Sequence, residues 1–587
     1  MSSQKEIIKM DEVVIRFSGD SGDGMQLTGT QFSDTSALFG NEVSTFPDYP
    51  AEIRAPQGTV GGVSGFQVHF GRKEILTPGD YCDVLVAMNP AALKANLQWV
   101  KPTGTIIVNI DSFDEKNIKK AGYTADPLED NENWSYKLVK ANITSMTKDT
   151  LKDSGLDQKS IVRSKNMFAL GIVYWMFDRP LDHTLEFLDK KFAKIPEIAE
   201  ANKKVLKAGF DFAHNIQALA YHYEINPAQI EKGTYRNITG NKATAWGLMA
   251  AAEKANLPLF CGSYPITPAT EILQELALRR DLGVKTMQAE DEIAGICTAI
   301  GASYVGNIGV TTTSGPGLAL KSEAINLAVI TELPLVIVDV QRGGPSTGLP
   351  TKTEQSDLSQ ALFGRNGESP MPIVAASTSG NCFKFAYEAT RIALEHMTPV
   401  ILLTDGYLAN GAQPWKIPSM KDLPSITPTL VSSDEKDYLP YKRDAETLVR
   451  KWAIPGTKGL EHRIGGLEKL DGKGSISYIP ENHELMCKYR RDKVKLISNN
   501  IPEQEIYGDK EGGEILIIGW GGTYGHLSTA VRELREEGKN VSLAQFNYIN
   551  PLPKNTKDIF SRFKKHIVFE LNLGQFVNYL RNEQPEF

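Results

Sequence analysis

Apolar residues in the middle of the chain fall into two alternating patterns. Short uninterrupted apolar runs predict buried strands at 257–261, 308–313, 334–340 and 399–404. Between them, longer stretches with apolar residues at helical spacing predict helices at 242–256, 268–280, 291–305, 318–330 and 382–397. Strands that alternate with helices in this way are typical of a doubly wound parallel sheet.

Similar patterns occur on both sides of this block. The N-terminal side has predicted strands at 12–19, 83–89 and 104–110, followed by a helical region at 164–222 that ends in a long stretch at 196–223. The C-terminal side has predicted strands at 514–522, 540–547 and 566–572 and a helix at 523–538. Two alternating blocks and a shorter third one predict a multi-domain α/β protein.

We expect four segments along the 587 residues. A Rossmann-like domain occupies 1–225, and a doubly wound domain occupies 226–410, of which 226–239 is a polar linker. Residues 411–510 are rich in prolines, charges and glycines, so we expect an irregular excursion without a large core of its own. A smaller α/β domain follows at 511–587.

Composition excludes several classes of protein. The net charge of −7 gives no broad positive surface for nucleic acid. No apolar run approaches the length of a membrane span, and the first residues lack the apolar core of a signal peptide. We therefore expect a cytoplasmic protein that binds neither nucleic acid nor a membrane.

The five cysteines are scattered and include no CxxC pair. They are Cys82, Cys261, Cys297, Cys382 and Cys487. A disulfide framework is not expected in the cytoplasm, and an iron–sulfur cluster needs four closely organised thiolates. We expect all five to be small buried apolar residues, and any redox cluster to belong to another chain.

Two glycine-rich turns deserve comparison with known ligand motifs. "GDSGDG" (19–24) lacks the GxGxxG spacing, and Asp20 and Asp23 would repel a pyrophosphate, although a ligand or another chain could still approach so many glycines. Its "GDG" resembles a metal motif for thiamine diphosphate, but the asparagine needed about thirty residues later is missing, so we place no metal at Asp23. "GWGGTYG" (519–525) suits close packing better than anion binding.

"SYPITP" (263–268) stiffens the chain just after a predicted strand. Tyr264 and Thr267 each precede a proline, which favours extended geometry, and Pro268 suits the first position of a helix. Open α/β sheets bind their ligands at the carboxyl ends of the strands. The sequence therefore predicts that Thr267 is held at a binding edge.

Three successive carboxylates precede the helix predicted at 291–305. Glu290, Asp291 and Glu292 suit a helix N-terminus, yet the helix itself is nearly uncharged. We therefore expect that helix to be buried and at least one of the three carboxylates to point into a dry space. Small residues at 295, 299 and 301 would allow very close packing, as at a subunit interface.

Arg342 follows the apolar strand predicted at 334–340 and begins a glycine-rich loop that carries Lys352. A guanidinium at a strand end can bind a carboxylate through two hydrogen bonds. An arginine and a lysine ten residues apart suit a substrate with two acidic ends. A solvated surface position is the alternative for either residue.

Four of these stretches together resemble one enzyme family. They are "YPITP", "EDEIAGICTAIGASYVG", "TTTSGPG" and "QRGGPSTGLPTKTEQSDL". The chain resembles the α subunits of 2-oxoacid:ferredoxin oxidoreductases, most closely the 2-oxoglutarate enzymes with a γ domain fused in front. The resemblance implies a γ domain, a domain that binds the pyrimidine of thiamine diphosphate, and a transketolase C-terminal-like domain.

The resemblance also implies roles for individual residues. Glu292 matches the catalytic glutamate that bonds the pyrimidine ring, and Tyr264, Pro265 and Ile266 would border the same coenzyme together with Thr267. Thr267 and Arg342 match the residues that bind the carboxylate of the substrate. Lys352, flanked by Thr351 and Thr353, is our candidate for a second carboxylate, unless the partner chain supplies that cation.

The implied enzyme decarboxylates 2-oxoglutarate oxidatively to succinyl-CoA, or runs in the reductive direction. Coenzyme A is the co-substrate, ferredoxin the electron carrier, and thiamine diphosphate is shared with a β subunit that holds Mg²⁺ and a [4Fe–4S] cluster in an (αβ)₂ assembly. Pyruvate or a branched-chain 2-oxoacid is the alternative substrate. A non-catalytic subunit that binds coenzyme A or a nucleotide is the alternative of another class.

Overall fold

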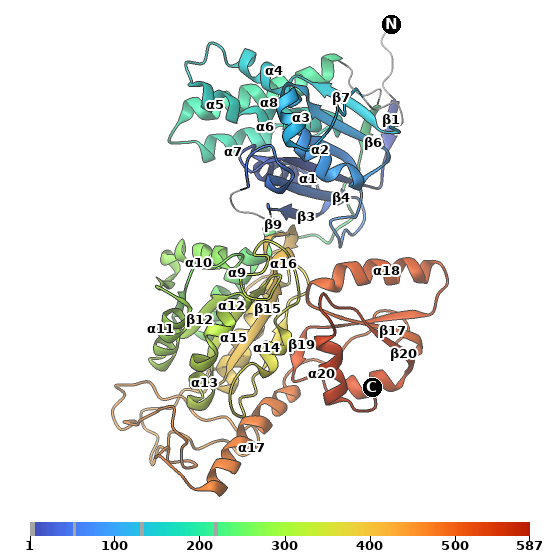
Figure 1. Cartoon of the computed structure of the whole chain (residues 1–587). Helices are drawn as coiled ribbons and strands as arrows, with labels where there is room; N and C mark the ends of the chain where they lie inside the picture. Colours follow the sequence, from blue (N-terminus) through green and yellow to red (C-terminus); the bar gives the residue numbers. More distant parts are fainter. Residues whose placement is uncertain (1–5, 51–54, 130–133, 217–220) are drawn as a thin grey trace. The chain divides into compact units, whose positions relative to one another are not determined.

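The computed structural model describes residues 6–50, 55–129, 134–216 and 221–587. The chain divides into two compact units (Figure 1). The first contains residues 1–237 together with 411–417, and the second contains residues 238–410 and 418–587. Each unit is built around its own parallel or mixed sheet, so the expected multi-domain α/β architecture is confirmed.

The first unit contains a six-stranded sheet of order β3-β4-β2-β5-β6-β7. β4 pairs antiparallel with β2 and β3, whereas the pairs of β2, β5, β6 and β7 are parallel. The strands are β2 (Glu12–Asp20), β3 (Glu42–Asp48), β4 (Val63–Gly71), β5 (Cys82–Ala87), β6 (Val100–Asn109) and β7 (Lys137–Ala141).

Helices cover this sheet, and two of them approach each other very closely. A Cβ on Gly171 of α6 would lie 2.2 Å from the carbonyl oxygen of Leu206 in α8, and a Cβ on Gly209 would lie 2.1 Å from that of Phe168. Only glycine fits at both crossing points. The helices are α1 (Met25–Leu38), α2 (Pro90–Asn96), α3 (Glu115–Lys120), α4 (Ile143–Thr150), α5 (Gln158–Arg163), α6 (Lys165–Met176), α7 (Asp182–Lys191) and α8 (Pro196–Ile216).

The long helix predicted to reach residue 223 ends earlier. Residues 217–220 lie outside the described part, and β8 (Tyr221–Glu224) is a strand that pairs in parallel with β1 (Glu6–Lys9). The predicted linker at 226–239 also contains a strand, β9 (Tyr235–Thr239), which pairs with β16 (Ala412–Lys416). Both predictions were wrong because pairing with a distant segment, which local pattern does not reveal, decides these short strands.

The second unit contains a seven-stranded sheet of order β11-β10-β12-β13-β15-β14-β19. All neighbours are parallel except β19, which pairs antiparallel with β14. The four predicted strands are confirmed to within two residues. The strands are β10 (Leu259–Ser263), β11 (Lys285–Gln288), β12 (Ile308–Thr313), β13 (Leu335–Gln341), β14 (Ile373–Ala375), β15 (Pro399–Asp405) and β19 (Tyr548–Asn550).

The helices around this sheet follow the predicted order with two local differences. Pro268 lies in a turn after a cis Thr267–Pro268 bond, and the helix begins only at Thr270. The helix predicted at 318–330 is interrupted at Lys321 and forms two helices. The helices are α9 (Gly240–Ala255), α10 (Thr270–Ala277), α11 (Glu292–Tyr304), α12 (Gly315–Leu320), α13 (Ser322–Thr331), α14 (Leu358–Phe363), α15 (Cys382–His396) and α16 (Gly406–Asn410).

The C-terminal part of the second unit forms a three-stranded parallel sheet of order β18-β17-β20. A Cβ on Gly522 would lie 2.2 Å from Oδ2 of Asp405, at the end of β15. The glycine-rich turn at 519–525 therefore serves close packing, as predicted. The elements are β17 (Gly513–Trp520), β18 (Val541–Phe546), β20 (Phe563–Val568), α18 (Tyr524–Glu536), α19 (Thr556–Ser561) and α20 (Gln575–Glu583).

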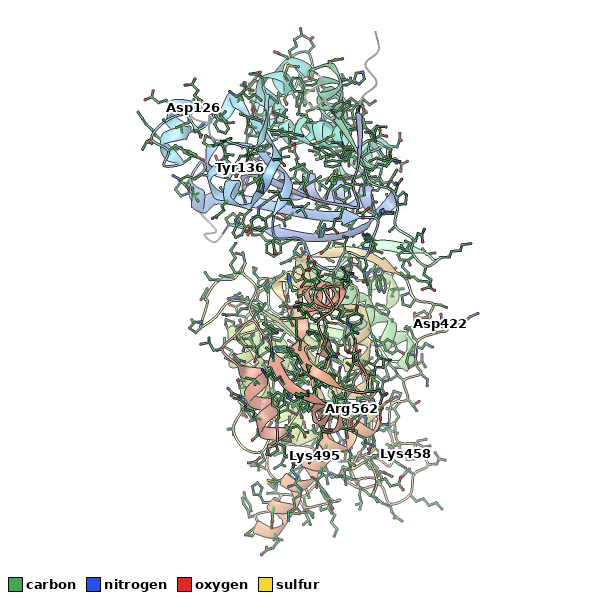
Figure 2. All side chains as sticks on the ribbon, turned by 90° about the vertical axis from the view of Figure 1, so that its right-hand side faces the viewer. Asp126, Tyr136, Asp422, Lys458, Lys495 and Arg562 are labelled. Atoms are coloured by element: carbon green, nitrogen blue, oxygen red, sulfur yellow. The ribbon has the colours of Figure 1, made fainter. Side chains whose placement is uncertain are left out.

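The segment from 418 to 510 is largely irregular apart from α17 (Pro480–Leu496). A buried ion cluster attaches it to the central domain. Glu332, at the end of α13, accepts hydrogen bonds from Arg443 Nη2 at 2.5 Å and Lys493 Nζ at 2.7 Å. Arg450 donates to the Glu332 carbonyl oxygen at 2.9 Å. Other basic residues are exposed and take no part in this cluster, among them Lys458 and Lys495 in the same segment and Arg562 in the C-terminal part (Figure 2).

Burial by itself would raise the pKa of Glu332, but Lys493, Arg443 and Arg450 outweigh it and hold that pKa at about 2. Its ionised form is therefore favoured by folding. This stabilisation is present above the ordinary glutamate pKa of 4.5 and is lost as the pH falls toward 2.

We predict that Glu332→Gln lowers the unfolding midpoint strongly, because removing one partner of a buried ion cluster costs about 3–5 kcal/mol. The difference from the unmodified chain should narrow as the pH falls from about 4.5 to about 2. Denaturant unfolding at several pH values measures both effects. Glu484→Gln, at an exposed pair with Lys488, is the control, and equal midpoints for the two variants would contradict the prediction.

Candidate coenzyme and substrate site

The predicted binding segments gather at one edge of the seven-stranded sheet. Residues 264–269 follow β10, 289–291 follow β11, 314–317 follow β12 and 342–357 follow β13. These four strands are adjacent in the order β11-β10-β12-β13 and parallel. Their carboxyl ends therefore bring the segments together, as expected for a ligand-binding edge.

Arg342 joins two of these segments directly. Its Nη1 donates to the carbonyl oxygen of Thr267 at 2.7 Å, and its Nη2 donates to that of Thr347 at 3.2 Å. Arg342 is 7% exposed, and its Nε has no hydrogen-bond partner among the described residues. Burial lowers the pKa of this guanidinium, while Asp357 opposes the shift. The structure thus brings Arg342 and Thr267 together. The guanidinium binds the backbone carbonyl group of Thr267, a residue that is itself exposed.

The loop after Arg342 closes on itself. Gly343 N donates to the Lys352 carbonyl oxygen at 2.9 Å, and Leu349 N donates back to that of Gly343 at 2.8 Å. Thr351, Lys352 and Thr353 are half-buried in the returning part of this loop. Thr353 Oγ1 would lie 3.3 Å from a Cβ on Gly406, and Pro268 Cγ would lie 3.9 Å from it. Thr353 and the proline-rich segment therefore border the same space.

The three carboxylates before α11 have different surroundings. Asp291 caps the helix, since its Oδ1 accepts a hydrogen bond from Ala294 N at 2.8 Å, and Glu290 is exposed. Glu292 is half-buried against the "TTTSGPG" loop, where a Cβ on Gly317 would lie 2.9 Å from its Cγ. Of the three carboxylates, Glu292 is the one that packs against this loop, although it is only half-buried.

Lys321 is a residue of this site that the sequence argument missed. It is fully buried, and its Nζ donates to the carbonyl oxygen of Glu292 at 2.8 Å. Burial lowers the pKa of Lys321 to about 8, against the opposing charges of Glu292 and Asp291. The only signal in the sequence is a lysine that directly follows the apolar run from Gly315 to Leu320.

Comparison with known proteins identifies the family. A family model described as "Pyruvate flavodoxin/ferredoxin oxidoreductase, thiamine diP-bdg" matches residues 251–477, and one described as "Pyruvate ferredoxin/flavodoxin oxidoreductase" matches 14–212. The 2-oxoglutarate oxidoreductase subunit KorA of Mycobacterium tuberculosis is 52% identical over 575 residues, which are 98% of this chain and 88% of that protein. The chain belongs to the 2-oxoacid:ferredoxin oxidoreductase family.

Other members agree in sequence and in fold. The α subunit of 2-oxoacid:ferredoxin oxidoreductase 1 from Aeropyrum pernix is 30% identical over 455 residues, covering 75% of this chain and 69% of that one. The 2-oxoglutarate:ferredoxin oxidoreductase of Magnetococcus marinus, solved with 2-oxoglutarate, coenzyme A and succinyl-CoA bound, superposes with a TM-score of 0.84. It is 31% identical, and the match covers 98% of this chain and 95% of that structure.

The surface of α11 differs from the expectation that the helix is buried and that its small residues at 295, 299 and 301 allow close packing. Gly295 and Ala299 face the sheet, and a Cβ on Gly295 would lie 3.2 Å from Ser263 Cα. Gly301 is exposed with open space beside it. Residues four apart share a helix face, whereas the step from 299 to 301 turns to another side. The three small residues therefore do not form one surface. The helix is only half-buried, because Ile293, Cys297 and Gly301 are exposed.

Two cysteines also depart from the expected burial. Cys82, Cys261 and Cys382 are buried as predicted, but Cys297 is exposed on α11 and Cys487 is partly exposed on α17. Both lie on the outward side of their helices. Their exposure therefore depends on how the helices pack and not on the residue type.

The acidic turn near the N-terminus is occupied by contacts within its own unit. Asp23 pairs with Lys165 at 2.8 Å, and Asp20 accepts the Gly58 N–H at 3.1 Å. Within the described part of the chain, no three His, Cys, Asp or Glu residues form a cluster that could hold a metal ion. None of the described helices is long and apolar enough to span a membrane.

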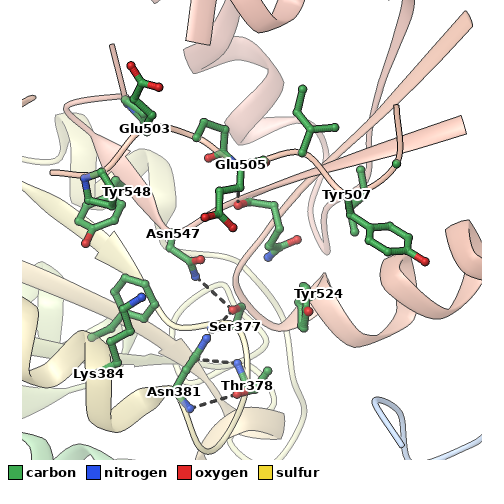
Figure 3. A pocket seen from close by; sticks show the side chains of 18 of the residues that line it. Ser377, Thr378, Asn381, Lys384, Glu503, Glu505, Tyr507, Tyr524, Asn547 and Tyr548 are labelled. Carbon is green, nitrogen blue, oxygen red and sulfur yellow. Dashed lines mark hydrogen bonds between the residues drawn. The ribbon is translucent and has the colours of Figure 1, made fainter. Parts of the chain in front are cut away.

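A separate pocket of about 740 Å³ opens elsewhere in the second unit (Figure 3). It lies between the start of α15, the segment 502–510 and the strands β18 and β19. Asn381 Oδ1 accepts the N–H groups of Ser377 and Thr378, both at 2.9 Å, and Asn547 donates to Ser377 Oγ at 3.1 Å. None of the predicted site residues lines this pocket.

Proposed function

We propose that this chain is the α subunit of a cytoplasmic, coenzyme A-dependent 2-oxoglutarate:ferredoxin oxidoreductase. It acts in the oxidative decarboxylation of 2-oxoglutarate to succinyl-CoA, or in the reverse reductive carboxylation. The observation that carries the proposal is the 52% identity, over 98% of the chain, to a subunit named for 2-oxoglutarate. The gathering of Arg342, Thr267 and Glu292 at one sheet edge supports it.

The residues at this edge fit thiamine diphosphate. Glu292 offers a half-buried carboxylate, and Gly317 lets the "TTTSGPG" loop pack directly against its side chain. We assign Glu292 to the pyrimidine ring and Tyr264, Pro265 and Ile266, all half-buried, to its border. When bound, thiamine diphosphate supplies a nucleophilic carbon for the 2-oxo group and accepts the charge left by carbon dioxide.

The chain's own groups bind and orient the substrate. The Arg342 guanidinium is the cation for the carboxylate next to the ketone, since its Nε has no partner among the described residues. A charge-assisted hydrogen bond from a buried guanidinium is strong and directional. The Thr267 hydroxyl, on the same segment that Arg342 holds, lies beside this carboxylate in our assignment. Lys321 fixes the start of α11 and so the position of Glu292.

The remaining cofactors belong to a partner in this proposal. We assign Mg²⁺ and the [4Fe–4S] cluster to a β subunit, with ferredoxin as electron acceptor and an (αβ)₂ assembly. The support from this chain is a sequence without a CxxC pair and three exposed apolar residues on or next to α11 and α12. Ile293 follows Glu292 at the start of α11, Val305 follows its other end, and Leu320 ends α12; they are 50%, 51% and 56% exposed. We place the contact with the β subunit on the outer side of α11.

Pyruvate is the second candidate substrate, because both matching family models carry that name. Pyruvate has one carboxylate and needs only Arg342. A second cation in the site, Lys352 in our assignment, would favour 2-oxoglutarate.

Our first prediction for this function concerns the partner. The purified chain alone should be colourless and inactive, and it should become active and brown when co-expressed with its β subunit. Visible absorption and turnover of 2-oxoglutarate with coenzyme A and an electron acceptor measure this. An iron–sulfur spectrum from the isolated chain would refute our assignment of the cluster.

Glu292→Gln should reduce turnover by about 10²–10⁴-fold, the usual contribution of general acid–base assistance. Binding of thiamine diphosphate should weaken less, because one hydrogen bond to a charged group contributes roughly 1.5–3 kcal/mol. Glu290→Gln is the matched control and should do little, since Glu290 is exposed. The reverse order of the two variants would show that Glu290 is the catalytic carboxylate.

Lys352→Met should raise the KM for 2-oxoglutarate by about a hundredfold and leave activity on pyruvate little changed. The loss of a charge-assisted bond of a few kcal/mol accounts for this, since about 1.4 kcal/mol corresponds to tenfold. Steady-state kinetics on both acids decides the matter. Equal losses on both would mean that Lys352 maintains the loop and that the partner chain supplies the second cation.

A further inference from the structure

Two aspartates are buried behind the Arg342 loop. Asp339 lies on β13 and is 0% exposed, and Asp357 lies just before α14 and is 6% exposed. Within the described part of the chain, neither carboxylate oxygen of Asp339 has a hydrogen-bond donor, and neither does Oδ2 of Asp357. Buried polar atoms without partners are rare because each costs free energy, so this arrangement needs an explanation.

The two carboxyl groups lie close enough to change each other's ionisation, since Asp357 raises the pKa of Asp339 both by its charge and by a side-chain contact. Ionised carboxylates only accept hydrogen bonds, so this contact is favourable only when one of the two carries a proton. Burial, with the charge of Asp357, raises the pKa of Asp339 well above its ordinary value. Burial also raises the pKa of Asp357 to about 6, with Glu354 acting in the same direction and Arg342 against it. A shared proton satisfies both groups.

Asp357 is connected to Arg342 through a neighbouring hydroxyl. Ser356 Oγ lies 2.9 Å from Asp357 Oδ1 and 2.7 Å from the carbonyl oxygen of Arg342. The backbone N–H of Asp357 donates to Gln341 Oε1 at 3.2 Å. These hydrogen bonds join the two ends of the loop, because Ser356 binds Arg342 and Asp357 binds Gln341.

The "TTTSGPG" loop reaches the same carboxyl group. A Cβ on Gly315 would lie 2.4 Å from Asp357 Oδ1, so only glycine allows this approach. Two residues later, Gly317 makes room for Glu292. One loop after β12 therefore packs against the aspartate pair and against Glu292.

We propose that Asp339 and Asp357 share a proton and act as positioning residues that hold Arg342 in place for the substrate carboxylate. The inference deepens the proposed function and rests on it for the role of Arg342. The charged groups that act on Asp357 are Asp339 on β13, Glu354 on the loop and Arg342 at its start. One proton on the pair leaves a single negative charge, which balances the guanidinium.

The test compares two substitutions in the complex with the β subunit. In Asp357→Asn, the amide donates to Asp339 and still accepts from Ser356, so kcat and KM for 2-oxoglutarate should stay within about threefold. In Asp357→Leu, both contacts are lost, and KM should rise at least about tenfold while kcat falls less. Glu332→Gln, which removes a buried carboxylate from another cluster, should lower stability without raising KM.

Infrared spectra of the whole chain test the shared proton without any substrate. At neutral pH the unmodified chain should show the carbonyl band of a protonated carboxyl group, and the double variant D339N/D357N should lack it. The absence of that band in the unmodified chain would overturn the inference, and so would an Asp357→Asn variant as impaired as Asp357→Leu. A chain that shows the band but never acts on 2-oxoglutarate would overturn the proposed function instead.

Discussion

The site depends on one buried guanidinium between two loops. Arg342 leaves the end of β13, donates to the Thr267 carbonyl oxygen after β10, and braces its own loop through Thr347. The intervening strand β12 separates β10 from β13, and this contact joins the loops that follow them. Because a buried guanidinium loses its contacts with water, its hydrogen bond to the Thr267 carbonyl oxygen helps to hold the proline-rich segment in place.

Glycines set how closely the surrounding segments approach. Gly315 admits Asp357, Gly317 admits Glu292, and Gly522 admits Asp405. At each position a side chain would have to occupy space already taken by an acidic side chain, and at Gly317 also by the Thr313 hydroxyl. Burying a carboxyl group raises its pKa, as at Asp357 and Asp405, both at about 6. The close packing at Gly315 and Gly522 thus buries Asp357 and Asp405, and the same burial raises their pKa values.

Buried ions also explain how an irregular segment keeps its place. The residues from 418 to 510 contain little regular structure, yet Tyr441, Arg450 and Trp452 are almost fully buried. Glu332, at the end of α13, accepts hydrogen bonds from Arg443 and Lys493 of this segment. A buried carboxylate with several cations specifies one arrangement, because any other leaves a charge unpaired in the interior. The expected excursion is therefore irregular in backbone but fixed to the central domain.

The sequence by itself determined the alternation of strands and helices, because burial on both faces of a parallel sheet makes the strands uninterrupted apolar runs. It also indicated which segments reach the binding edge, since parallel strands end together, and so pointed to Thr267 and Arg342, whereas only the family resemblance selected Glu292 from three neighbouring carboxylates. Only the tertiary structure decided the partners of buried groups. Lys321 and the pair Asp339–Asp357 lie among apolar residues or far apart in sequence, and nothing local shows that they face Glu292 or each other. The exposed side of α11 and the short strands β8 and β9 were likewise decided by contacts between distant segments, which no periodicity along the chain encodes.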